Sequence, residues 1–149
     1  MKDEPKLAIQ IEAESIQVHE EMNSNELEAP KFIYSYQQGT GNLHWTDISS
    51  GKSFSHSFPQ FTFLNCCSWC ALPQDHIYFT GVQTSKEVVS FSRRFLTLTP
   101  RPPMLNARSS HNSVYTGGYL YVIGGYYSST ALRECERFSV AENKWEAIS

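Results

Sequence analysis

From residue 31 onwards, hydrophobic positions come in short runs of Val, Ile, Tyr, Phe and Thr, separated by Gly, Pro, Asn and Ser. Residues 77–80 and 120–123 are typical, and each of these two runs ends at a glycine. β-Branched and aromatic residues in short runs bounded by turn-forming residues indicate β-strands. No window of 11 residues after residue 30 keeps the three- and four-residue apolar spacing of a helix without glycine, proline or a β-branched run. The pattern therefore predicts an all-β body.

This body repeats itself. Residues 68–81 align without a gap on residues 111–124, an offset of 43 positions. In both copies a short strand runs into a turn, at residues 73–76 or 116–119, and returns as an apolar strand. Residues 87–98 then follow at an offset of 47 from residues 134–145, because four extra residues fall within 126–133. Each copy is predicted to contain four strands, with a loop of variable length between the second and third.

A partial third copy precedes these two. Residues 31–36 are predicted to be its third strand and residues 43–48 its fourth, while its first two strands are not recognisable. A four-stranded unit of roughly 45 to 50 residues has the length of one β-propeller blade.

Residues 108–149 resemble a kelch repeat. The segment begins with Arg108-Ser-Ser-His111, continues through an apolar strand that ends at Gly124-Gly125, and places six residues between Phe138 and Trp145. The second copy departs from this pattern, with Val82 after Gly81 and Leu98 at the tryptophan position. In the first copy, Tyr36 lies two residues too far from Trp45.

The resemblance implies a partial kelch-type β-propeller with four-stranded antiparallel blades over residues 31–149. We expect a partial blade at 31–57, a degenerate blade at 58–103 and a well-matched blade at 104–149. Tryptophans should pack between blades, double glycines should allow close backbone approach or positive φ, and the histidine should satisfy groups near a strand start. The residues with such structural roles are Trp45, Gly81, His111, Gly124, Gly125, Phe138 and Trp145.

Residues 1–30 have a different character. They carry eight acidic and two basic side chains, whereas residues 31–149 carry seven and ten. Leu7, Ile11, Val18 and Met22 have helical spacing, yet residues 7–11 also alternate like a strand. We predict an acidic N-terminal segment or linker, helical or disordered, that ends at Pro30. A helical dimerisation arm is the alternative.

Composition excludes several classes of function. The net charge is −3 and the basic residues are scattered, which argues against nucleic-acid binding. No apolar run approaches the roughly 20 residues that span a membrane, and the first residues lack a signal-peptide pattern, so we expect a cytoplasmic protein. Cys66, Cys67, Cys70 and Cys135 resemble no disulfide framework, and strand alternation separates Cys67 from Cys70. We expect small core-filling thiols and no metal site.

No catalytic constellation is recognisable. The histidines lie without an acid and a nucleophile at a known spacing, and the Gly-rich stretches lack the lysine and helix of a phosphate site. We therefore expect no enzyme and no cofactor.

The kelch resemblance implies an interaction scaffold or adaptor that binds another protein through loops at the blade edges. The residues predicted to bind this partner are Arg93, Arg94, Arg101, Arg108, Tyr126 and Tyr127. Closed propellers contain about four to eight blades. The chain is therefore expected to be a piece of a longer propeller, or alternatively to complete a ring with blades from other copies. The rival function is a segment of a kelch-propeller enzyme, an oxidase or a sugar-modifying protein, which would need clustered ligands or acid/base pairs.

Overall fold

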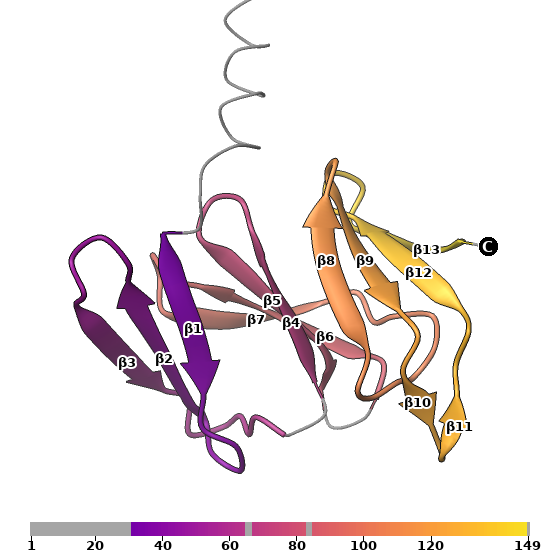
Figure 1. The fold of residues 1–149 in the computed structure, drawn as a ribbon, viewed down its shortest axis with the longest axis horizontal. Coiled ribbons are helices and arrows are strands. Elements are labelled where there is room, and N and C mark those ends of the chain that lie inside the picture. The colour runs from indigo at the N-terminus through magenta and orange to yellow at the C-terminus, as the bar shows by residue number, and fades with distance from the viewer. Residues whose placement is uncertain (1–30, 65–66, 83–84, 149) are drawn as a thin grey trace, which may run out of the picture.

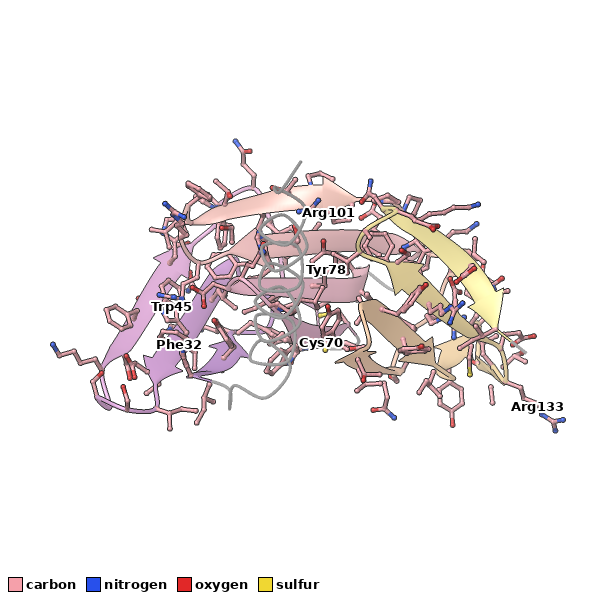
Figure 2. All side chains as sticks on the ribbon, turned by 90° about the horizontal axis from the view of Figure 1, so that it is seen from above. Phe32, Trp45, Cys70, Tyr78, Arg101 and Arg133 are labelled. Atoms are coloured by element: carbon pink, nitrogen blue, oxygen red, sulfur yellow. The ribbon has the colours of Figure 1, made fainter. Side chains whose placement is uncertain are left out.

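The computed structural model describes residues 31–64, 67–82 and 85–148, and β-strands are the regular secondary structure of these residues. Three larger antiparallel sheets stand side by side in an arc, with one short hairpin attached to the third (Figure 1). The view from above shows the same arc (Figure 2). The all-β, blade-like fold is confirmed. The predicted acidic segment 1–30 and Cys66 lie outside the described residues.

Each sheet is a meander of neighbouring strands. The first sheet consists of β1 (Phe32–Tyr36), β2 (Asn42–Asp47) and β3 (Ser53–Ser57), in that order. The second consists of β4 (Ser68–Leu72), β5 (His76–Val82), β6 (Glu87–Ser92) and β7 (Thr97–Arg101). The third consists of β8 (Asn112–Thr116), β9 (Tyr119–Ile123), β12 (Cys135–Ser139) and β13 (Lys144–Ile148), with the hairpin β10 (Tyr126–Tyr127) and β11 (Thr130–Ala131) between β9 and β12.

Strand β5 lies at the centre of the arc, and both of its faces are covered. Ile77 and Phe79 belong to a core cluster shared with the first sheet, whereas Tyr78 belongs to a second cluster shared with the third sheet. Successive side chains of a strand point to opposite faces, so an unbroken apolar run is what a doubly covered strand requires. The second sheet is therefore packed as a blade between two neighbours.

The two tryptophans predicted to pack between blades lie in these clusters. Trp45 is 6% exposed and its ring centre lies 5.6 Å from that of Phe91 in the second sheet. Trp145 is 5% exposed, lies 5.3 Å from the ring of Phe138, and donates its Nε1 hydrogen to the carbonyl oxygen of Pro102 over 2.8 Å. Trp145 thus connects the outer strand β13 to the chain segment that enters the third blade.

The strand assignment of the first sheet corrects the sequence prediction. Residues 31–36 and 43–48 are not its last two strands, because β3 follows β2 and pairs with it. The segment from β3 to β4 spans residues 58–67, and the segment from β7 to β8 spans 102–111, so both connections have equal length. By this equivalence β1, β2 and β3 are the second, third and fourth strands of a blade. Trp45 then pairs with Phe54, as Phe91 pairs with Leu98.

The strand registers define two rims. His76 pairs with both Leu72 and Ser92, and Ser92 pairs with Thr97, so the turns at 73–75 and 93–96 lie at one end of the strands. We name this end, with the equivalent turns 117–118 and 140–143, the turn rim. The hairpin β10–β11, the connection 102–111 and the described residues of the connection 58–67 lie at the opposite end, the connection rim.

Candidate functional site

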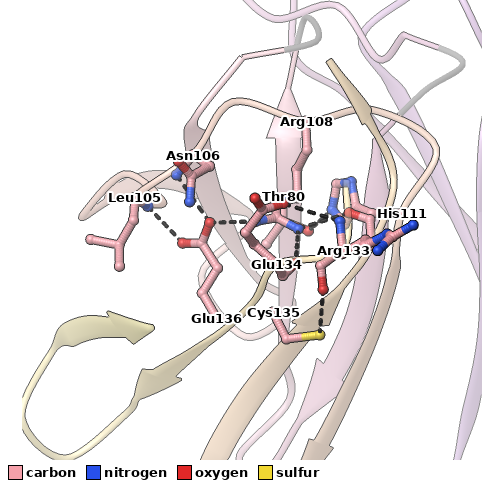
Figure 3. Close-up of polar contacts among 10 residues, drawn as sticks. Thr80, Leu105, Asn106, Arg108, His111, Arg133, Glu134, Cys135 and Glu136 are labelled. Carbon is pink, nitrogen blue, oxygen red and sulfur yellow. Dashed lines mark hydrogen bonds and ion pairs between the residues drawn. The ribbon is translucent and has the colours of Figure 1, made fainter. Parts of the chain in front are cut away.

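The most deeply buried charges of the described chain meet at the connection rim. Arg108 lies on the segment from β7 to β8, Glu136 lies on β12, and their side chains are 0% and 1% exposed. Nη2 of Arg108 donates to Oε1 of Glu136 over 2.6 Å, and Nη1 donates to the carbonyl oxygens of Gly124 and Glu134 over 2.7 and 2.9 Å (Figure 3). A buried ion pair is stable only where further hydrogen bonds compensate its lost hydration. The pair therefore fastens the connection to the strands of the third blade.

The carboxylate of Glu136 also shapes the connection itself. Its Oε2 atom accepts the backbone N–H of Leu105 over 2.6 Å, and Oε1 accepts that of Asn106 over 3.0 Å (Figure 3). Both residues lie outside the strands, so their backbone N–H groups donate to a side-chain carboxylate and not to a neighbouring strand. One buried carboxylate thus sets the path of the chain between two blades.

His111 links the second and third blades. Its Nε2 atom lies 2.8 Å from the hydroxyl oxygen of Thr80 on β5, and both side chains are buried. Burial is the main cause that lowers the pKa of His111 to about 4, and the nearby charge of Arg108 lowers it further. The imidazole is therefore neutral at pH 7 and serves as a hydrogen-bond partner between blades.

Two glycines allow the connection to pass between the blades. A Cβ atom on Gly81 would lie 2.6 Å from the carbonyl oxygen of Arg108, and one on Gly125 would lie 2.6 Å from that of Ser109. Both glycines also have positive φ, at 70° and 97°. Gly124 has φ 62° without such a contact, so its requirement is conformational. The glycines of the repeat are explained by this close approach and by their left-handed backbone.

The pKa of His111 predicts a loss of stability in acid. The imidazole of His111 has a pKa of about 6.5 in the unfolded chain, whereas its pKa in the folded protein is about 4. The free energy of unfolding should therefore fall as the pH drops from about 6.5 to about 4, by about 3 kcal/mol in total. Denaturant titrations across this range, on the wild type and on His111→Gln, measure the contribution. If the free energy of unfolding fell equally steeply with pH in the wild type and in His111→Gln, this role of the histidine would be contradicted.

The structure separates the four arginines that the sequence predicts to bind a protein partner. Arg108 is buried, so its side chain does not reach the surface. Arg93 forms an ion pair with Asp75 and lies over the ring of Phe32, at 4.0 Å, between the first two blades. Arg101 donates from Nε to the hydroxyl of Ser90 over 2.8 Å. Only Arg94, of these four, has an exposed side chain without an ion pair to the described residues.

Tyr126 and Tyr127 stand on the surface of the connection rim, 52% and 55% exposed. They form β10 of the inserted hairpin, whose turn places Ser128 and Ser129 at positive φ. The backbone N–H of Tyr126 donates to the carbonyl oxygen of Ser109 over 2.9 Å, and the reverse bond has the same length. The hairpin is therefore held against the same connection that Arg108 fastens, while its aromatic rings face solvent.

Sequence reasoning missed Glu136 and Thr80. A signal for Glu136 is its position two residues before Phe138, which places an acidic side chain on the buried face of an apolar strand. A buried carboxylate needs a cationic partner, and the connection upstream supplies Arg108. Thr80 carries no such signal, because threonine is common in strands.

The described residues contain no group of three or more His, Cys, Asp and Glu side chains that could hold a metal ion. Cys67, Cys70 and Cys135 are free thiols, and burial raises the pKa of Cys70. Within the described part of the chain, no helix is long and apolar enough to cross a membrane.

The three antiparallel sheets of three or four strands are consistent with neighbouring blades of a partial kelch-type β-propeller (Figure 1). Residues 107–149 match the family model for the kelch motif, so the third blade is a kelch repeat. Mouse Kelch-like protein 35 is 32% identical over 93 residues, which are 62% of this chain and 16% of that protein. A fungal alcohol oxidase of the AA5 family, solved in complex with copper, superposes with a TM-score of 0.57 at 18% identity, over 77% of this chain and 27% of the oxidase. The second likeness shows the fold alone, and the chain spans only a small part of either protein.

Proposed function

We propose that this chain is a protein-interaction module of kelch-repeat type, which binds another protein through the hairpin β10–β11. The observation that carries the proposal is the pair of exposed tyrosines, Tyr126 and Tyr127, on a hairpin whose backbone is bonded to Ser109. Tyrosines supply a large contact area at low entropic cost, and a rigid support lowers that cost further. The distant likeness to Kelch-like protein 35 supports a scaffold or adaptor role.

The same proposal makes the chain a segment of a longer propeller. Both outer faces of the arc carry exposed apolar side chains, with Ile33 63% exposed on β1 and Val114 and Ile123 47% and 46% exposed on the third blade. In the middle blade the corresponding faces are covered. Further blades would bury these residues. Free thiols are typical of proteins in reducing compartments, which supports the proposed cytoplasmic location.

A photo-crosslinking experiment tests the recognition hairpin. With a photoreactive residue at position 127 of the full-length protein, we expect one discrete protein adduct in cells. Tyr126→Ser and Tyr127→Ser should each weaken binding of that captured protein about tenfold or more, as loss of an interface anchor does. Phe95→Ser is the matched control, because Phe95 is an exposed aromatic residue on the turn rim. Equal affinity for all of these variants and the wild type would exclude the hairpin as the binding site.

A further inference from the structure

The turn between β6 and β7 has an unusual sequence for its conformation. Ser92 pairs with Thr97 and Ser139 pairs with Lys144, so residues 93–96 and 140–143 form equivalent four-residue turns. The last residue of each turn has φ 52°, but it is Asn143 in the third blade and Leu96 in the second. Asparagine tolerates the left-handed region, whereas leucine pays a conformational cost there. The choice of leucine is therefore not explained by the stability of the turn.

The same turn exposes apolar surface. Phe95 is 68% exposed, more than any other large hydrophobic residue of the described chain, and Leu96 is 40% exposed. Glu142 occupies the equivalent of Phe95 in the third blade. A strained residue beside exposed aromatic surface points to a binding function, because neither feature favours folding.

Leu96 also forms part of the wall of an apolar recess. This recess has a volume of about 540 Å³ and lies between the segment that follows β3 and the strands β6 and β7. Its main apolar lining residues are Phe58, Phe61, Val89, Leu96 and Leu98. The apolar surface thus continues from the tip of the turn into a space that can hold large side chains.

The charge beside this surface is positive. Arg94 is exposed, its guanidinium carbon lies 5.4 Å from the ring centre of Phe95, and it meets no carboxylate within residues 31–64, 67–82 and 85–148. An occupant that combines acidic and large apolar side chains would complement the turn and the recess together.

We propose that the chain's own residues 20–28 dock on the surface formed by Arg94, Phe95, Leu96 and the recess. This segment carries Glu20, Glu21, Glu26 and Glu28 around Met22 and Leu27. The described chain begins close to this docking surface, because Phe32 on β1 contacts the guanidinium of Arg93, which precedes Arg94 in the turn.

The tether between the docking segment and the described chain is short. Residues 29 and 30 separate Glu28 from Lys31, so the three residue steps between these two residues span roughly 10 Å when extended. A short tether also gives the segment an effective concentration in the millimolar range, so a weak contact suffices. The inference does not depend on the proposed recognition hairpin β10–β11, because none of its residues lines the recess.

Hydrogen–deuterium exchange of the full chain tests the docking. In the wild type, the amides of residues 20–28 should exchange about tenfold more slowly than in a free peptide of the same sequence. Arg94→Glu and Phe95→Ser should each return them to within about twofold of the free peptide. Arg133→Glu, the same charge change at an exposed arginine of the third blade, should leave the protection unchanged. Unchanged protection in β5 shows that each variant is folded.

Exchanging the charges between the turn and the docking segment provides a second test of the docking. Combining Arg94→Glu with Glu26→Lys and Glu28→Lys should restore at least half of the lost protection. The proposal would be overturned if the amides of residues 20–28 in the wild type exchanged as fast as in the free peptide. It would also be overturned if their protection survived both Arg94→Glu and Phe95→Ser. Protection that disappears on dilution would also overturn it, because the segment would then bind a second copy of the chain.

Discussion

Replacing Arg108 with methionine should lower the free energy of unfolding by about 3 to 5 kcal/mol, because it leaves the buried carboxylate of Glu136 without its cation. Methionine keeps much of the volume of the arginine, so the loss reports on charge and hydrogen bonds more than on a cavity. The side chain also forms two hydrogen bonds to the carbonyl oxygens of Gly124 and Glu134, which lose their donor. Denaturant titration at fixed protein concentration measures the change.

A second Arg–Glu pair of the third blade supplies the control. Arg137 on β12 pairs with Glu146 on β13, and these side chains are 33% and 46% exposed. Solvent screens such a pair, so Arg137→Met should cost much less unfolding free energy than Arg108→Met. Similar losses in Arg108→Met and Arg137→Met would show that burial does not distinguish the two pairs.

Replacing Trp145 with alanine should cost about 3 to 5 kcal/mol of unfolding free energy, the range for loss of a buried aromatic side chain. The indole fills the cluster between the second and third blades and also donates to the carbonyl oxygen of Pro102. The change therefore removes packing and one hydrogen bond at the same junction. The same titration, with tryptophan-independent circular dichroism as the signal, measures it.

Tyr127→Ser is the comparison for this prediction. Tyr127 is 55% exposed, so its removal should change stability by no more than about 0.5 kcal/mol. Small and equal effects at Trp145 and Tyr127 would refute the interior position of the tryptophan.

The parts of the fold that the sequence predicts correctly are those with a local signal. The apolar run in β5 predicts a buried strand, and Gly81 after this run predicts a backbone constraint. Both signals lie in residues that are close together in the sequence. The alignment of Phe91 with Phe138 and of Leu98 with Trp145 holds in the structure. Phe91 pairs with Leu98 and Phe138 pairs with Trp145, and the turns between the paired strands have equal length.

The first blade was harder to predict. Strand β3 has the sequence Ser-Phe-Ser-His-Ser, whose serines give little strand signal. Tyr34 lies opposite Trp45, and the turn between β1 and β2 sets this register. These errors arise where long-range pairing overrides weak local preference.

The candidate site shows the same limit more clearly. An arginine in a proline-rich connection looks solvated, and only the pairing of β9 with β12 brings Glu136 to Arg108, 28 positions away in sequence. Tyr126 and Tyr127 were located correctly in an inserted loop, because four additional residues in one copy of a repeat mark an insertion without any knowledge of its partners.

We propose that further blades cover the two outer faces of this run of blades. Sedimentation equilibrium of the isolated chain over a wide concentration range tests it most directly. We expect an average mass above the 17.0 kDa of one chain, rising with concentration, because exposed Ile33, Val114 and Ile123 drive association. A single 17.0 kDa species at every concentration would contradict the claim.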